Sequence, residues 1–511
     1  MDSDYHTQTE VEPGRPTSGD YLAPALIAAA VMILHVATDG RYGFHRDELQ
    51  TLDDARHLAW GFVALPPFTP FIERLSMALF DTSLVGLRLF SVLAQGAVIV
   101  LTALMARELG ATRLGQVVAA FAVTIDPVSM FDGVISQYSS FDLLWWVLIA
   151  WFLVRLLKYG DSRWWIAIGA VIGIGVLTKY SMPFYVAGIS GALLLTPERR
   201  YLKSRWLWYG AALSVLIFLP NVIWEVRHGF ISIHFLQYIH QRDIGEGRTS
   251  GFIPHQFLLN SNVMLTPLWL AGLYYFLADR EGKRSRFFGW LYLIPMVLFL
   301  ALKGRDYYAA GLYPVLFAGG SVLWDRWVRW MRPAWARVAQ VATFAAIALG
   351  GYGVGRALLP LGPISPSNYE LKVNGELREE IGWTNFVAEV ARIRDSLPST
   401  EQAHLGIITG NYGETGAIDL YGPSYGLPQA ISGTNTAWYR GYGNPPPQTL
   451  IVVGLSREDA DRTFQSCRLA GHNGNPYGIE NEESMDHPDI FVCGPPQLPW
   501  PEFWKRFQSF G

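Results

Sequence analysis

The strongest constraint on the fold is a series of apolar runs, many of them long enough to cross a lipid bilayer. About 20 apolar residues in a helix span the hydrocarbon core. Only 16% of the residues are charged, whereas soluble domains average about 25%. The sequence therefore predicts a polytopic α-helical membrane protein. Its eleven candidate spans are 22–39, 84–106, 114–130, 139–157, 164–178, 181–195, 206–224, 262–278, 287–302, 307–324 and 338–358.

The distribution of Lys and Arg predicts the orientation of these spans. Cytoplasmic loops of membrane proteins are enriched in these residues. With eleven spans, five basic clusters fall on the side of the polar N-terminal tail, which predicts a cytoplasmic N-terminus and an extracytoplasmic C-terminal part. The first apolar run has no small-residue cleavage pattern, so we interpret it as a retained span. The clusters contain Arg107 and Arg113; Arg155, Lys158 and Arg163; Arg199, Arg200, Lys203 and Arg205; Arg280, Lys283, Arg284 and Arg286; Arg326, Arg329, Arg332 and Arg337.

The composition divides the chain into three parts: a tail (1–20), a membrane domain (21–360) and an extracytoplasmic domain (361–511). Past Pro360 no apolar run of span length remains. Leu405–Thr409 and Leu450–Val453 are typical of buried strands, whereas 385–393 and 457–464 have helical patterns. This alternation predicts a small α/β domain.

Two features of this C-terminal domain indicate further properties. Gly410 to Gly416 follows a predicted strand and opens a helix, but it lacks the lysine of a phosphate loop, so it favours nucleotide binding only weakly. Both cysteines of the chain, Cys467 and Cys493, lie in this domain. If the compartment is oxidising, we expect them to form a disulfide.

The predicted topology leaves two long external loops, 40–83 and 225–261. The first contains Asp47 and Glu48 beside His45 and Arg46. Adjacent carboxylates next to a membrane span cost free energy unless they have a function or are well solvated. The sequence therefore leaves two interpretations, a functional pair or an ordinary solvated loop. The apolar spacing from Glu48 to Ala59 predicts an interfacial helix, and 71–80 a second short one.

Further charges share the external face in this topology. Asp142 lies at the outer end of the fourth span, Lys179 in the turn between the fifth and sixth, and Lys303 with Arg305 after the ninth. Fixed cations bind phosphate, and a carboxylate can take a proton from a hydroxyl group. The alternative is that each charge only snorkels or ends a helix. The histidines of loop 225–261 lack the i, i+4 spacing of a helical metal site.

Three motifs in this order resemble the family 39-type membrane glycosyltransferases. They are His45-Arg46-Asp47-Glu48-Leu49, Leu65-Pro66-Pro67-Phe68-Thr69-Pro70 and the segment from Lys303 through Tyr307-Tyr308 to Tyr313-Pro314. This family contains enzymes similar to dolichyl-phosphate-mannose–protein mannosyltransferases and is related to the aminoarabinose transferases that modify lipid A. The resemblance covers about residues 20–325, and the segment 411–417 also looks like the external domain of bacterial members.

The resemblance implies a C-type glycosyltransferase fold, a polyprenyl-phosphate sugar donor and inversion at the anomeric carbon. It implies that Asp47 is the catalytic carboxylate and that Glu48 supports it by orienting the acceptor or a divalent cation (Mg²⁺ or Mn²⁺), although a metal requirement stays open. Asp142 would correspond to a second external acidic residue, and Lys303 would hold the donor phosphate, with Arg305 and Lys179 as weaker candidates. Tyr307 and Tyr308 would line the substrate site. The sugar and the acceptor are not indicated.

Two other functions remain open on the sequence alone. A transporter or flippase of lipid-linked sugars would place its polar residues near mid-span, whereas here they gather at one face. A scaffold with a sensing external domain would leave Asp47 and Glu48 without a role. The net charge of −3 indicates no nucleic acid partner. We therefore expect a multi-pass enzyme of the inner (plasma) membrane, surrounded by membrane lipids.

Overall fold

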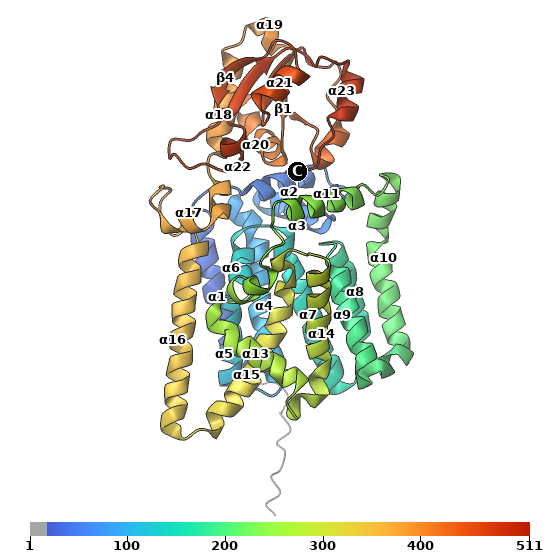
Figure 1. Cartoon of the computed structure of the whole chain (residues 1–511), viewed down its shortest axis with the longest axis vertical. Coiled ribbons are helices and arrows are strands. Elements are labelled where there is room, and N and C mark those ends of the chain that lie inside the picture. Colours follow the sequence, from blue (N-terminus) through green and yellow to red (C-terminus); the bar gives the residue numbers. More distant parts are fainter. Residues whose placement is uncertain (1–17) are drawn as a thin grey trace, which may run out of the picture.

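The computed structural model describes residues 18–511, which form a helical bundle with an α/β domain on one end (Figure 1). The predicted tail, 1–20, lies almost wholly outside the described residues. In the described part of the chain, six helices are long and apolar enough to cross a membrane, and a bent pair would make seven. Five of the six are α1 (Ser18–Thr38), α4 (Leu84–Glu108), α7 (Tyr138–Tyr159), α10 (Arg205–Arg227) and α16 (Pro333–Leu358). The sixth, Glu281–Ala301, consists of the 3₁₀ helix Glu281–Ser285 and α14 (Arg286–Ala301).

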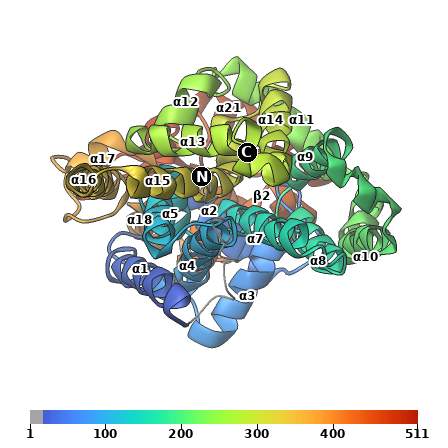
Figure 2. The same cartoon turned by 90° about the horizontal axis from the view of Figure 1, so that it is seen from below.

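The remaining predicted spans also coincide with helices, although length and composition do not identify these as spans. They are α8 (Trp164–Val176), α9 (Met182–Leu195), α13 (Thr266–Leu277) and α15 (Tyr313–Trp330). The apolar windows of α10 and α16 are only 11% buried, and the two helices lie at opposite edges of the bundle (Figure 2). Their exposed apolar surface is what a lipid-facing helix requires.

The predicted span 114–130 is not one continuous helix. The chain forms α5 (Arg113–Thr124) and α6 (Pro127–Val134), which are bent by 62° relative to each other. Proline has no N–H to continue the helical ladder, and the Asp126 carboxylate caps the new helix by accepting the Ser129 N–H at 2.9 Å. The Asp126-Pro127 pair therefore ends one helix and begins the next.

Several of the basic clusters meet at the end of the bundle away from the α/β domain (Figure 1). Lys158 pairs with Glu108 at 2.8 Å, which joins the ends of α7 and α4. Arg326 of α15 pairs with Asp279 at 2.6 Å, in the connection between α13 and α14. Loops that are distant in the sequence thus lie on one side, as the charge pattern predicted.

The two predicted external loops contain helices. Loop 40–83 forms α2 (Arg46–Arg56) and α3 (Phe68–Phe80), which confirms both predicted helices. Segment 225–261 is mainly helical rather than an open loop, because α10 continues to Arg227 and is followed by α11 (Ile231–Gly245) and α12 (Phe252–Leu258). Buried Phe235 and Phe252 anchor these two helices.

The C-terminal domain is built on a five-stranded mixed sheet in the order β2-β1-β3-β5-β4. Strand β1 is parallel to β2 and β3, whereas β5 is antiparallel to β3 and β4. The two predicted strands, 405–409 and 450–453, are β1 and part of β3, and the predicted helices 385–393 and 457–464 correspond to α18 and α21; the other elements were not predicted. The strands are β1 (Leu405–Thr409), β2 (Ala430–Ser432), β3 (Thr449–Val453), β4 (Arg468–His472) and β5 (Asp489–Cys493); the helices are α17 (Tyr369–Val373), α18 (Trp383–Asp395), α19 (Ser399–Gln402), α20 (Tyr412–Tyr421), α21 (Arg457–Thr463), α22 (Glu482–Asp486) and α23 (Trp500–Arg506).

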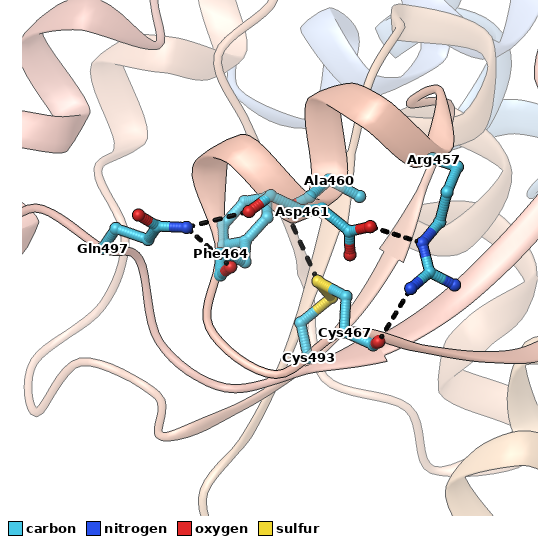
Figure 3. The surroundings of a disulfide bond; sticks show 7 residues. All are labelled: Arg457, Ala460, Asp461, Phe464, Cys467, Cys493 and Gln497. Carbon is cyan, nitrogen blue, oxygen red and sulfur yellow. Dashed lines mark hydrogen bonds and ion pairs between the residues drawn. A yellow bond between two sulfur atoms is a disulfide. The ribbon is translucent and has the colours of Figure 1, made fainter.

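The structure joins Cys467 and Cys493 in a disulfide, with their Cα atoms 4.1 Å apart. Figure 3 shows this bond beneath α21, where Cys467 precedes β4 and Cys493 ends β5. Both cysteines belong to an apolar cluster on one face of the sheet that also contains Phe464 and Phe491. The disulfide therefore ties the start of the edge strand β4 to the end of its neighbour β5.

The C-terminal domain and α2 share one hydrophobic core. Leu49 and Leu52 of α2 pack in the same cluster as Trp383, Ala417 and Ile418. Figure 1 shows α2 between the helical bundle and the domain. The helix that contains Asp47 is therefore fixed from both sides.

Candidate active site

A cavity of about 690 Å³ lies where the helical bundle meets the C-terminal domain. Its walls come from α2, the turn before α9, α11, the segment 303–308 and the C-terminal domain. Six of the eight predicted site residues line it, and the other two, Glu48 and Asp142, lie behind the lining. The six are Asp47, Lys179, Lys303, Arg305, Tyr307 and Tyr308.

Asp47 lies in the first turn of α2 and lines the cavity. The N-cap residue His45 accepts the Asp47 N–H through Nδ1 at 3.1 Å. Tyr412 donates its hydroxyl to Asp47 Oδ1 at 3.1 Å. A helix N-terminus also favours a negative charge. The carboxylate is thus held in place beside open space, as a general base requires.

Glu48 points away from the cavity and is fully buried. Arg88 of α4 donates to its two oxygens at 2.8 and 2.7 Å. The backbone N–H groups of Ser136 and His45 donate at 2.7 and 2.8 Å. The two adjacent carboxylates therefore do different things: Glu48 fixes the start of α2, and Asp47 faces the space where a substrate could bind.

Asp142 supports Lys179 from beneath the cavity lining. Trp146 Nε1 and the Ser181 hydroxyl donate to the two oxygens of Asp142, each at 2.9 Å. Lys179 Nζ lies 3.9 Å from Asp142 Oδ2. The ammonium group also lies 4.5–5.0 Å from the ring centres of three tyrosines, which brings the predicted Tyr307 and Tyr308 together with an unpredicted one, Tyr138.

A basic wall, which we define as Arg242, Arg248, Lys303 and Arg305, closes another side of the cavity. Arg305 is held by Asp243 of α11 through two hydrogen bonds of 2.5 and 2.6 Å. This pairing raises the pKa of Arg305 although burial opposes its charge. Lys303 is exposed and makes no ion pair within residues 18–511. It is therefore the predicted cation most available to an anionic ligand.

The sequence alone did not point to Arg242 and Arg248 as site residues. Both lie in segment 225–261, but no motif marks either of them. They reach the cavity because α11 returns over the segment 303–308, where Asp243 meets Arg305. The only sequence indication was an unusual concentration of cations on a face that is otherwise poor in them.

The C-terminal domain contributes a set of carboxylates around α2. His45 Nε2 lies 3.3 Å from Glu376, and Arg46 pairs with Glu482 and with Glu483, the latter at 3.5 Å. Burial, reinforced by the nearby Glu483, raises the pKa of Glu379 to about 7. These contacts, together with Tyr412, show that the cavity is completed by a domain more than 300 residues away in sequence.

No group of three or more His, Cys, Asp or Glu side chains in the described residues is arranged to hold a metal ion. In the predicted pair of Asp47 and Glu48, the oxygens of Glu48 accept hydrogen bonds from Arg88 and from two backbone N–H groups. Of the loop histidines, His255 pairs with Asp306 at 2.5 Å. Asp47 is the member of the pair that faces the cavity, where a cation could reach it.

The sequence and the fold match known membrane glycosyltransferases. Residues 64–224 match the dolichyl-phosphate-mannose-protein mannosyltransferase family. The lipid A galacturonosyltransferase RgtD of Rhizobium johnstonii is 26% identical over 378 residues, which are 71% of this chain and 74% of that protein.

The structure of ArnT from Cupriavidus metallidurans bound to undecaprenyl phosphate aligns with 94% of this chain, and the alignment covers 98% of the ArnT chain. The TM-score is 0.58 and the sequence identity 13%. The structure of the Archaeoglobus fulgidus oligosaccharyltransferase aligns with 85% of this chain, and the alignment covers 68% of that protein's chain. The TM-score is 0.54 and the sequence identity 14%.

The resemblance expected from the sequence is confirmed. The chain has the C-type glycosyltransferase fold of these structures, with a small sheet in its C-terminal part. With several apolar helices it is a multi-pass membrane protein. The relatives support a glycosyltransferase function of the ArnT and mannosyltransferase kind.

Proposed function

We propose that this protein transfers a sugar from a polyprenyl-phosphate donor to an acceptor hydroxyl on the extracytoplasmic face of the membrane. The observation that carries the proposal is the cavity in which Asp47, a positioned carboxylate, shares the space with the basic wall. A transfer reaction of this kind needs a base for the incoming hydroxyl and cations for the departing phosphate.

In this mechanism the acceptor oxygen attacks the anomeric carbon while Asp47 takes the hydroxyl proton. The bond between the anomeric carbon and the phosphate oxygen breaks, and its electrons stay with the lipid phosphate. Lys303, Arg242 and Arg248 stabilise the negative charge of this leaving group. Because the nucleophile and the leaving group occupy opposite sides of the carbon, the configuration inverts. Lys179 and the three tyrosines around it, Tyr138, Tyr307 and Tyr308, hold the donor in the cavity.

A lipid-linked donor is supported by the apolar part of the cavity wall. Phe184, Phe235, Leu236 and Ile239 line the cavity together with the cations. Phe184 belongs to α9 and the other three to α11, so two helices contribute apolar side chains to the cavity that also contains the cations. Undecaprenyl phosphate bound to ArnT, whose fold this chain shares, supports the same class of donor.

The proposed orientation places the N-terminus in the cytoplasm and residues 361–511 outside the inner membrane. It is supported by the basic loops at the end away from the C-terminal domain and by the disulfide within that domain, which is typical of an oxidising compartment. A reporter fused after residue 360 tests it, since cytoplasmic reporter activity would contradict the placement. The eleven spans remain part of this proposal.

The test of the proposed function compares wild type with Asp47→Asn in proteoliposomes. Labelled polyprenyl-phosphate donors carrying neutral, amino and uronic acid sugars are supplied with lipid A, glycan and peptide acceptors, with and without a chelator. We expect transfer by the wild type from at least one donor and a loss of about 10²–10⁴-fold in Asp47→Asn. Asp161→Asn, an exposed aspartate outside the cavity, is the matched control and should keep wild-type activity.

Two results would overturn parts of the proposal. Full transfer by Asp47→Asn would remove Asp47 as the base. Movement of intact donor across the membrane without any glycosylated product would instead support the transporter alternative. A site for transport is expected near mid-bilayer, whereas this cavity lies at the boundary with the C-terminal domain.

A further inference from the structure

The glycine-rich segment 410–416 has a role in the structure that its resemblance to a phosphate loop did not suggest. It leads from β1 into α20, and its Tyr412 reaches into the cavity beside Asp47. We propose that Tyr412 is a positioning residue of the transfer reaction. Its hydroxyl fixes Asp47 Oδ1, which leaves Oδ2 directed to the acceptor. This inference rests on the function proposed above.

The glycines of the segment allow α20 to lie directly against α2. A Cβ atom on Gly416 would collide with the backbone carbonyl of Leu49, which cannot move without displacing α2. A Cβ atom on Gly413 would lie 2.8 Å from the Trp383 ring and 3.3 Å from Arg46 Cβ. Small residues at close helix contacts allow such an approach. The glycines therefore set the distance between the two helices rather than cradle a phosphate.

The Tyr412 ring is held by Arg46, the residue before Asp47. The Arg46 guanidinium lies 4.7 Å from the centre of the ring, a distance suited to a cation–π contact. Glu482 and Glu483 hold the guanidinium from the side of the C-terminal domain. The ring is thus fixed by its helix and by a cation that is itself fixed.

The hydrogen bond from Tyr412 gives the C-terminal domain a direct part in the reaction. Within the described residues, Tyr412 is the only side chain with a hydrogen bond to the Asp47 carboxylate. A carboxylate without this bond could rotate about its last torsion, because such terminal torsions are broad. Holding one oxygen removes that freedom, and orientation of the base contributes to the rate rather than to donor binding.

The test compares Tyr412→Phe with Tyr421→Phe in the full-length protein. The two tyrosines lie on the same helix, and within residues 18–511 Tyr421 makes no hydrogen bond to the Asp47 carboxylate. We expect Tyr412→Phe to lower kcat about 10-fold, the effect of losing a hydrogen bond to a charged group, with the KM for the donor changed less than twofold. Tyr421→Phe should keep wild-type kcat. A purely structural role would lower the melting temperature without this separation of kcat from KM.

A second measurement follows the contact itself without turnover. The reactivity of Asp47 towards a carbodiimide and an amine, mapped by mass spectrometry, should rise in Tyr412→Phe and not in Tyr421→Phe. An unchanged kcat in Tyr412→Phe, beside an active wild type, overturns the positioning role alone. A wild type that transfers no sugar overturns the proposed function, and the positioning role with it.

Discussion

Replacing Glu48 by glutamine is expected to destabilise the protein more than it slows the transfer reaction. The Glu48 and Arg88 side chains are 0% and 1% exposed and share two hydrogen bonds of 2.8 and 2.7 Å. Removing the charge of one partner leaves the other buried without full compensation, which costs about 3–5 kcal/mol. Glu380 lies 3.5 Å from the same guanidinium, so we expect about 3 kcal/mol, the lower end of that range.

This loss of stability can be measured as a shift in melting temperature. At about 2 °C per kcal/mol, the value for larger domains, the expected decrease is about 6 °C. Intrinsic tryptophan fluorescence of the purified protein in detergent gives the melting temperature. Transfer is then measured well below it and expressed per folded molecule. Under those conditions Glu48→Gln should retain far more activity than Asp47→Asn.

Two further variants test the reasoning. Glu502→Gln breaks an exposed ion pair with Arg506, and it should shift the melting temperature by about 1 °C or less. The double variant Glu48→Gln/Arg88→Met should be less destabilised than the sum of the single variants, because the two residues interact directly. A Glu48→Gln protein with unchanged melting temperature and no transfer would refute this account and make Glu48 a catalytic residue.

Three other predictions follow from the site and the C-terminal domain. Lys303→Met should raise the KM for the donor about tenfold, because a charge-assisted contact to the phosphate is lost. Lys505 lies outside the cavity, so Lys505→Met should leave this KM unchanged. Reducing the Cys467–Cys493 disulfide, whose cysteines are 26 residues apart, should cost about 3.5 kcal/mol of unfolding free energy through the greater entropy of the unfolded chain, measured by melting with and without reductant. Burial and the nearby Glu483 raise the pKa of Glu414 from 4.5 to about 8. Between these pH values the native state keeps a proton that the unfolded chain loses, so the stability of the protein should fall as the pH rises. The melting temperature of Glu414→Gln should depend less on pH.

Each of these predictions has a result that contradicts it. An unchanged donor KM in Lys303→Met would remove this lysine from the phosphate site. Equal melting temperatures with and without reductant would show that the disulfide contributes nothing to stability. A wild type whose stability rises from pH 5 to pH 8, with Glu414→Gln unchanged in this respect, would contradict the effect assigned to Glu414.

Local sequence patterns were sufficient for many of the individual elements. Span-length apolar runs, the strand Leu405–Thr409 and the interfacial helix α2 depend on periodicity and length, and these act within one segment. The motif around Asp47 identified the cavity-lining carboxylate because its order along the chain carries the resemblance. The bend at Asp126-Pro127 could also have been expected, since proline and an N-cap residue stand together there.

Only the tertiary structure separated Asp47 from Glu48. In the sequence they are one acidic pair, but successive residues of a helix point about 100° apart, so one meets the cavity and the other meets Arg88. Arg242, Arg248 and Tyr412 reach the site through packing of segments that no local pattern connects. The sequence by itself determined the membrane class, many of the helices, two strands of the sheet and the carboxylate that we propose as the base. The partners of that carboxylate were decided by long-range packing, because helix and strand patterns specify which face is buried but not which segment buries it.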